Sequence, residues 1–311
     1  MEYRSQLLSI LSASGWSQEQ LAHSLGVSFV TVNSWINGRS VPRAKALVNI
    51  DKLYLDIVGV DEVDPESLAL AKQDALRLRT TAKSLVADRE LLDKLTLYLT
   101  YHTNTIEGST MTLSDVKGVI FEHKVLTNRT SIEQAEARNH QAALYWLIDE
   151  VARNGEDCIV NEDLILGIHL RLMNGIVGDA GQYRRRSVHI AGSRVPLANW
   201  VKIPSLINEL AANPMNPSED TIAVLAHTHA RFEKIHPFSD GNGRTGRLVM
   251  LVQALKAGLV PPLVIKERKY AYYKYLELAQ TKNDYKPLEL FIAESIKFTD
   301  ALLRSNTNFE L

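Results

Sequence analysis

The segment HPFSDGNGRTGR, residues 236–247, gathers several residue types that can act on phosphate groups. Apolar helical patterns flank it at 222–232 and 248–255, which predicts a loop between two helices. Gly241 and Gly243 can take positive φ, so that consecutive backbone N–H groups turn toward one point at the start of the second helix. A loop of this kind binds phosphate.

The charged side chains of the segment suit a nucleotide polyphosphate. Arg244 and Arg247 are three residues apart and share a face of the second helix, close to its positive end. Asp240 offers a hard oxygen ligand for Mg²⁺ beside the same phosphates. His236 supplies a base whose ordinary pKa lies near neutrality. Together these residues predict attack on a nucleotide phosphate.

The whole segment resembles the HPFx[D/E]GNGRxxR motif that defines the Fic family, with a match at every fixed position. Similarity continues through GQYRRRSVHIAG, residues 181–192, and through the tyrosine-rich stretch after Lys269, so that it covers most of residues 90–295. The resemblance implies an all-α fold, mainly the helices of a Fic domain with one small β-hairpin flap.

The resemblance also implies a protein adenylyltransferase, which transfers AMP from ATP to a Ser, Thr or Tyr hydroxyl of a target protein or of itself. His236 would deprotonate the hydroxyl, and Asp240 would hold Mg²⁺ against the α- and β-phosphates. Arg244 would neutralise the leaving pyrophosphate, and Arg247 would bind the γ-phosphate. The expected nucleotide-binding residues are Gly241, Asn242, Gly243, Arg244 and Arg247. Some Fic relatives transfer other groups, and no residue in the sequence reads the base, so ATP is the default donor.

A second match concerns regulation. The sequence TNTIEG, residues 103–108, resembles the [S/T]xxxE[G/N] inhibitory helix of Fic proteins, with Thr103, Glu107 and Gly108 at the fixed positions. Glu107 would form a bidentate pair with Arg247 and occupy the arginine that the γ-phosphate needs. Two alternatives stay open: Gly108 as an ordinary helix C-cap, and an ordered Glu107 that positions water to remove AMP from a modified protein.

The stretch VHIAGSRVP, residues 188–196, has short β-favouring runs around a Gly-Ser turn, which predicts a hairpin. In the Fic family this hairpin is a flap that holds the target segment in register, so we expect target docking along this edge. The flap residues are His189, Ile190, Ala191, Gly192, Ser193, Arg194, Val195 and Pro196.

The first 50 residues have the pattern of a helix-turn-helix. Ser17 and Gln20 form a capping box, Gly26 ends that helix, and Ser28 can cap the next one. The spacing resembles the lambda-repressor and Cro family over residues 3–50. The outward polar residues, which are the candidates for DNA contact, are Ser28, Thr31 and Asn33. The alternative for this module is a unit for protein contacts.

These patterns divide the chain into a helix-turn-helix domain at 1–55, an acidic linker at 56–75 and a Fic domain at 76–311, with the inhibitory helix around 95–108. The linker follows from charge, because residues 51–75 carry two lysines against seven acidic residues, a net of −5, and include Pro65. A second hypothesis for function is a DNA-binding transcriptional regulator whose Fic domain senses nucleotide.

Composition limits the remaining classes. The chain is 45% hydrophobic and 23% charged, as expected for a soluble globular protein, and its net charge of −1 gives no global field for nucleic acid. The most apolar stretch, 248–265, is interrupted by polar residues and prolines, and the N-terminus lacks a secretory signal. Cys158 is the single cysteine, so no intrachain disulfide forms. We therefore expect a cytoplasmic protein without membrane insertion. Homodimerisation is compatible with both domains.

Overall fold

A computed structural model describes residues 2–190, 193, 195–212 and 220–305. Over these residues the structure is helical and contains no strand. One isolated antiparallel bridge joins Arg79 and Leu259. The prediction of an all-α fold is confirmed. The chain forms two compact units, one from Met1–Glu62 with Glu267–Tyr275 and the other from Val63–Lys266 with Leu276–Asn308.

The first unit begins with four helices. They are α1 (Glu2–Ser14), α2 (Gln18–Leu25), α3 (Phe29–Ile36) and α4 (Ala44–Ile57). The capping box predicted at Ser17 and Gln20 is present, with both of its backbone bonds made, and Gly26 ends α2 in the left-handed conformation at φ 66°. Ser28 caps α3 by accepting the N–H of Thr31. The apolar faces enclose a small core of Leu7, Ile10, Leu21, Val32, Trp35 and Ile50.

A later segment completes this unit. Residues 267–275 contain the 3-10 turn η3 (Lys266–Arg268) and the start of α14 (Lys269–Lys282). Ala271 is buried in the core of the first unit, the hydroxyl of Tyr270 bonds to Asp56, and Lys274 Nζ lies 3.6 Å from the same carboxylate. The sequence alone places these residues in the Fic domain, because nothing in their composition shows that they pack elsewhere.

Most of the stretch interpreted as a linker, 56–75, is helical. Helix α5 spans Pro65–Leu76; Asp64 caps it by accepting the N–H of Ser67, and Pro65 stands in its first turn. Lys72 of α5 pairs with Asp220 and Glu289 of the second unit. An Asp-Pro pair starts a helix, since proline needs no hydrogen bond at that position, and the acidic charge suits the helix N-terminus.

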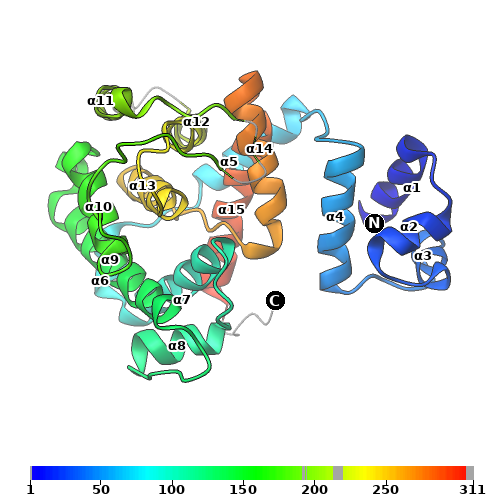
Figure 1. The fold of residues 1–311 in the computed structure, drawn as a ribbon, viewed down its shortest axis with the longest axis horizontal. Coiled ribbons are helices and arrows are strands. Elements are labelled where there is room, and N and C mark those ends of the chain that lie inside the picture. The colour runs from blue at the N-terminus through cyan, green and yellow to red at the C-terminus, as the bar shows by residue number, and fades with distance from the viewer. Residues whose placement is uncertain (1, 191–192, 194, 213–219, 306–311) are drawn as a thin grey trace. The chain divides into compact units, whose positions relative to one another are not determined.

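The second unit packs its helices around α13, which Figure 1 shows enclosed among α9, α10 and α12. Nearly every residue of α13 is buried, including its polar first turns. No helix in the described part of the chain is long and apolar enough to cross a membrane. Besides α5 the unit contains α6 (Ala82–Ala87), α7 (Arg89–Ile106), α8 (Leu113–Phe121), α9 (Ser131–Asn154), η1 (Gly155–Asp157), α10 (Glu162–Met173), η2 (Trp200–Lys202), α11 (Ile203–Ala211), α12 (Thr221–Ile235), α13 (Asn242–Lys256), the end of α14, and α15 (Lys286–Arg304).

Candidate active site

The segment 236–247 is a tight loop followed by the first turns of α13, as the flanking helical patterns predict. His236 ends α12 in the left-handed conformation, at φ 50°, and its N–H donates to Phe232 O at 2.9 Å. The side chain of Asn242 closes the loop, because its oxygen accepts the N–H of Phe238 at 2.8 Å and its nitrogen donates to Phe238 O at 2.9 Å. Asn242 therefore holds the loop with its side chain, and its backbone N–H faces outward at the helix start.

The two glycines of the loop act differently, and the expectation of positive φ is wrong for one of them. Gly241 has φ 76° and precedes α13. Gly243 lies within α13 and is not among the glycines with positive φ. It is needed for space, because a Cβ there would stand 2.5 Å from Glu107 Oε1 and 3.0 Å from Arg247 Nη1. Sequence spacing cannot reveal this crowding, since Glu107 comes from a distant helix.

The ring of His236 is oriented by a backbone carbonyl. Its Nδ1 lies 3.3 Å from Glu233 O, and because a carbonyl only accepts, this contact places the proton on Nδ1 and leaves Nε2 as the base. Burial lowers the pKa of His236 to about 4, so the ring is neutral at physiological pH. A neutral imidazole with an open Nε2 is the form that a general base requires.

Arg184 is a site residue that the sequence did not single out. It is 2% exposed, and its guanidinium donates to the backbone oxygens of His236, Arg186 and Ala198 at 2.7 Å each. The arginine thus ties the loop to the chain on both sides of the predicted flap. The sequence shows it only as one of three consecutive arginines, which gives no sign of burial.

Asp240 lies at the mouth of the loop with its side chain 59% exposed. Its Oδ1 accepts the N–H of Gly241 at 2.6 Å and lies 3.4 Å from Arg244 Nη2. Within the described residues no group of three His, Cys, Asp or Glu side chains could hold a metal. Mg²⁺ bound through substrate phosphates needs only one or two protein carboxylates. An exposed carboxylate beside a phosphate-binding loop fits that demand.

Arg247 is held by the end of α7. Its Nη2 lies 2.5 Å from Glu107 Oε1, and its Nε donates to Thr103 Oγ1 at 2.6 Å. Glu107 is the C-cap of α7, and Gly108 follows it at φ 112°. The structure therefore brings together Thr103, Glu107 and Arg247 as the sequence predicts. The inhibitory role of the pair stays a prediction.

Arg244 meets a second carboxylate that the sequence did not indicate. Its Nη1 lies 2.5 Å from Glu136 Oε1 on α9, and the arginine side chain is 4% exposed. Each arginine of the segment is thus bound by a carboxylate from outside it.

Neutral histidines surround these arginines. Burial, together with the nearby arginine charge, lowers the pKa of His140 on α9 and of His229 on α12 to about 3. Burial lowers the pKa of His169 on α10 to about 4, and its ring stacks on Phe238 of the loop. Burial has the opposite effect on Glu233, whose carboxyl pKa it raises to about 7. Because the histidines are neutral, the charges of Arg244 and Arg247 are balanced by the carboxylates of Glu136 and Glu107.

The predicted hairpin forms no strand in the residues that the structure describes, and the β expectation is corrected to that extent. Ser193 N–H donates to Ile190 O at 3.1 Å. Ala191, Gly192 and Arg194 lie outside the described residues. His189, Val195 and Pro196 have no regular secondary structure. A short β-favouring run forms a strand only where a partner strand is available to pair with it.

In the first unit the candidate DNA residues lie on α3 and its cap. Ser28 is exposed, and its Oγ lies 2.8 Å from Thr31 Oγ1. Asn33 is partly buried, and its side-chain nitrogen donates to Gln18 Oε1 of α2 at 3.1 Å. Ser28 is exposed and Thr31 is partly buried at the start of α3, whereas Asn33 also links α2 and α3.

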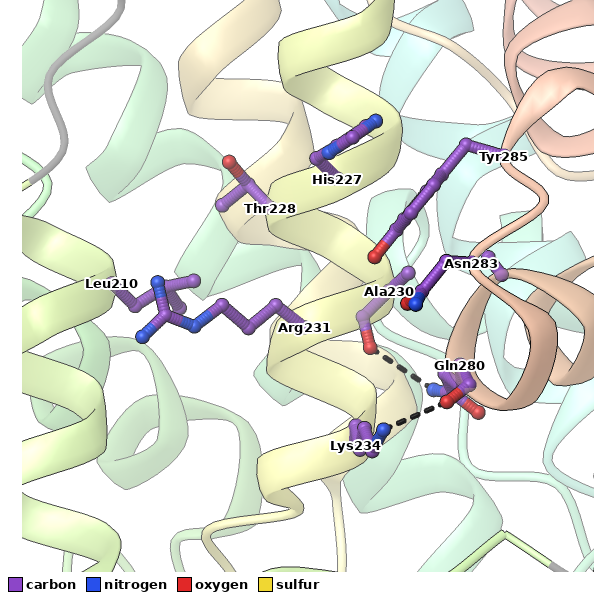
Figure 2. A pocket seen from close by; sticks show the side chains of 10 residues that line it. Leu210, His227, Thr228, Ala230, Arg231, Lys234, Gln280, Asn283 and Tyr285 are labelled. Carbon is purple, nitrogen blue, oxygen red and sulfur yellow. Dashed lines mark hydrogen bonds between the residues drawn. The ribbon is translucent and has the colours of Figure 1, made fainter.

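A pocket of about 370 Å³ opens beside α12, and none of the residues 236–247 line it. Figure 2 shows His227 beside the ring of Tyr285, with Arg231 extending toward Leu210. The pocket thus lies apart from the predicted site. The space next to Gly243 is filled by the side chain of Glu107, as the short Cβ distance shows.

Comparison with known families agrees with this geometry. The model of the Fic/DOC family matches residues 159–254, and a helix-turn-helix model matches residues 10–54. The chain contains a Fic domain. The Fic match ends within α13 and includes the whole loop, and the helix-turn-helix match contains α2 and α3.

Curated relatives carry the description protein adenylyltransferase Fic. The Aedes aegypti protein is 31% identical over 205 residues, which are 64% of this chain and 40% of the relative. The Nematostella vectensis protein is 29% identical over 273 residues, which are 86% of this chain and 61% of the relative. The chain thus spans about 40 to 61% of the length of these two relatives.

Solved structures share the fold. Fic-1 (residues 134–508) from C. elegans superposes with a TM-score of 0.62 at 19% identity and covers 96% of both chains. A Fic-domain signalling protein from Bacteroides thetaiotaomicron has a TM-score of 0.62 at 20% identity, over 76% of this chain and 97% of that one. At these identities the likeness concerns the fold alone.

Proposed function

We propose that the chain is a protein adenylyltransferase that transfers AMP from ATP to a hydroxyl of a target protein. The observation that carries the proposal is the neutral His236, with Nε2 open, beside the N-terminus of α13. Thr245 N–H makes the first backbone bond of that helix, to Gly241 O, so the N–H groups of residues 242–244 point out of its end. This end attracts phosphate.

The reaction follows from these positions. His236 Nε2 takes the proton of the target hydroxyl, and the hydroxyl oxygen attacks the α-phosphorus of ATP. The bond from the α-phosphorus to the bridging oxygen breaks, and pyrophosphate leaves with that electron pair. The N–H groups at the start of α13, with Arg244, stabilise the charge that develops. Asp240 would hold Mg²⁺, which supplies further neutralisation of phosphate charge when bound.

The same site is inhibited by α7 in this proposal. Arg247 is needed by the γ-phosphate, and Glu107 with Thr103 engages it. Glu107 also fills the space beside Gly243, where a nucleotide phosphate would approach the helix end. ATP that binds without these contacts is misaligned for in-line attack. Transfer therefore requires Glu107 to move.

Intact-mass measurement tests the reaction and the donor together. The Glu107→Gly protein is incubated with ATP and Mg²⁺, with or without other cellular proteins as targets. We expect a mass gain of one AMP per modified hydroxyl, faster than in the unchanged protein. A gain of another group would identify a different donor moiety. An unchanged mass for the protein and for every target would refute AMP transfer.

We propose a second activity for the first unit, the binding of DNA through α3. The observation in its favour is the helix-turn-helix match over residues 10–54, with Ser28 exposed and Thr31 partly exposed at the start of α3. A gel-shift with the DNA upstream of the gene, over a salt series, tests this. A specific complex survives salt that removes non-specific binding. No binding at low salt would leave the module as a unit for protein contacts.

A further inference from the structure

The ion pair between Glu136 and Arg244 is among the most enclosed charged contacts of the second unit. Arg244 Nη1 lies 2.5 Å from Glu136 Oε1, with side-chain exposures of 4% and 16%. The two residues are 108 positions apart, so the contact exists only because α9 packs beside α13. A carboxylate this close restricts the rotamers of a long side chain and fixes the direction of its guanidinium.

The other neighbours of Arg244 cannot do this equally well. Asp240 Oδ1 is 3.4 Å from Nη2, and its side chain is 59% exposed, so it is a distant and solvated partner. His140, one turn after Glu136 on α9, is neutral because burial and the nearby arginines lower its pKa to about 3. Glu136 is thus the close negative group that directs Arg244.

We propose that Glu136 is a positioning residue for AMP transfer, which holds the Arg244 guanidinium where negative charge develops on the leaving pyrophosphate. The inference rests on the proposed function of the site. A donor fixed before the reaction requires no reorganisation in the transition state, which is the main source of electrostatic catalysis. Glu136 therefore affects the reaction through Arg244, without contact to ATP.

This role has a kinetic signature. Glu136 cancels part of the positive charge that Arg244 offers to ATP, so removing it does not weaken ground-state binding. Removing it frees the guanidinium and lowers its effect in the transition state. We therefore expect kcat to fall while KM for ATP stays the same or decreases. A residue with only a structural role would reduce the folded fraction and leave kcat per folded molecule unchanged.

The test uses the full chain carrying Glu107→Gly. Glu136→Ala should lower kcat roughly tenfold to hundredfold, the range expected for a misplaced catalytic contact. Glu136→Gln, which keeps the side-chain volume and one acceptor oxygen, should lower it less. The affinity for ATP, measured by calorimetry in variants that also carry His236→Ala, should not weaken. Asp149→Asn is the matched control on α9, since Asp149 is exposed and pairs only at the surface with Arg153.

Epistasis with Arg244 decides whether Glu136 acts through it. In an Arg244→Ala background, adding Glu136→Ala should change kcat by less than about twofold, because the residue that it positions is gone. The double variant also removes the uncompensated buried charge that could unfold the single variant. Additive losses, an unchanged kcat in the single variants, or a gain in activity would each overturn the proposal. If the Glu107→Gly parent transfers no AMP, the proposed function fails first, and the positioning role fails with it.

Discussion

The catalytic segment and the helix-turn-helix obtain their geometry in opposite ways. In α2 and α3 the decisive bonds join residues three apart, as between Ser17 and Gln20. The two arginines of the segment 236–247 are instead held by residues far away in the chain: Arg247 meets Thr103 across 144 positions, and Arg244 meets Glu136 across 108. The first geometry is encoded locally, and the second depends on the packing of α7, α9 and α13. Substitutions at the two places should therefore have separate effects.

The largest effect is expected at the base. In the Glu107→Gly protein, His236→Ala should reduce AMP transfer by roughly 10²- to 10⁴-fold, the usual contribution of a general base. Transfer is measured with α-labelled ATP. His227→Ala is the control on the same helix, because its side chain is 55% exposed and lines the pocket of Figure 2, to which residues 236–247 do not contribute. Labelling that persists undiminished without His236 would show that the proposed chemistry is wrong.

A smaller effect is expected where α7 holds Arg247. Thr103→Val removes the hydroxyl that accepts the bond from Arg247 Nε and keeps the shape of the side chain. The contacts that hold Arg247 against α7 are therefore weakened. Basal transfer should rise roughly threefold to tenfold, less than with Glu107→Gly, since this one bond contributes only part of the free energy that holds Arg247 against α7. Thr105→Val is the control, because its hydroxyl bonds to Tyr101 O within α7. A decrease in transfer would contradict the inhibitory role of this contact.

The buried histidines of the second unit predict a pH effect on its stability. Their folded pKa values of about 3 to 4 lie well below the ordinary histidine pKa of 6.5, so unfolding takes up protons between about pH 3 and pH 6.5. The free energy of unfolding should therefore fall as the pH is lowered through this window, by about 1.4 kcal/mol per pH unit for each proton taken up. The residues are His102, His140, His169, His229 and His236.

Glu233 changes the stability in the opposite direction, because its carboxyl releases one proton on unfolding. Its folded pKa of about 7 exceeds the ordinary glutamate pKa of 4.5, so its stabilising contribution is present at low pH and is lost as the pH rises through that range. With five histidines against one carboxyl, urea unfolding at pH 5 should give a lower free energy than at pH 7. His123→Asn, at an exposed position, should leave the pH dependence unchanged. Equal stability at both pH values would mean that the histidines are not buried in neutral form.

The smallest effect is local to the first unit. Ser17→Ala removes the cap of α2 and should cost about 1 kcal/mol, seen as faster amide hydrogen exchange in α2. AMP transfer should not change. Ser24→Ala, at an exposed position of the same helix, is the control. A loss of transfer with Ser17→Ala would break the separation between the two regions.

The same contrast explains how much the sequence could predict. The caps of α2 and α3 and the loop before α13 were predicted, because each depends on neighbours in the chain. The partner of Arg247 was predicted through the family resemblance of TNTIEG, because no residue property places Glu107 beside an arginine 140 positions away. The roles of Glu136 and Arg184 were missed, since both depend on helix packing that has no local pattern.

The errors have physical reasons as well. Acidic charge with a proline at 65 indicated a linker, although Asp64 and Pro65 are also the ordinary start of a helix. Gly243 was expected to supply positive φ, but the crowding by Glu107 and Arg247 explains its lack of a side chain. The β-favouring residues near 190 form no strand in the part of this stretch that the structure describes, because backbone pairing depends on a partner that propensity cannot supply.

The two bonds between the Asn242 side chain and Phe238 affect how fast the site could change between an inhibited and an active state. Because this side chain already orders the loop, nucleotide binding costs no further conformational entropy for closing it. Switching then needs no refolding of the phosphate-binding loop. In the proposed mechanism it requires the displacement of the Glu107 carboxylate at the C-terminal end of α7, and side-chain rotations are among the fastest motions of a protein. If Glu107 inhibits the site as proposed, the strength of the contacts to Arg247 sets the lifetime of the inhibited state, and a signal that loosens them acts without a slow conformational step.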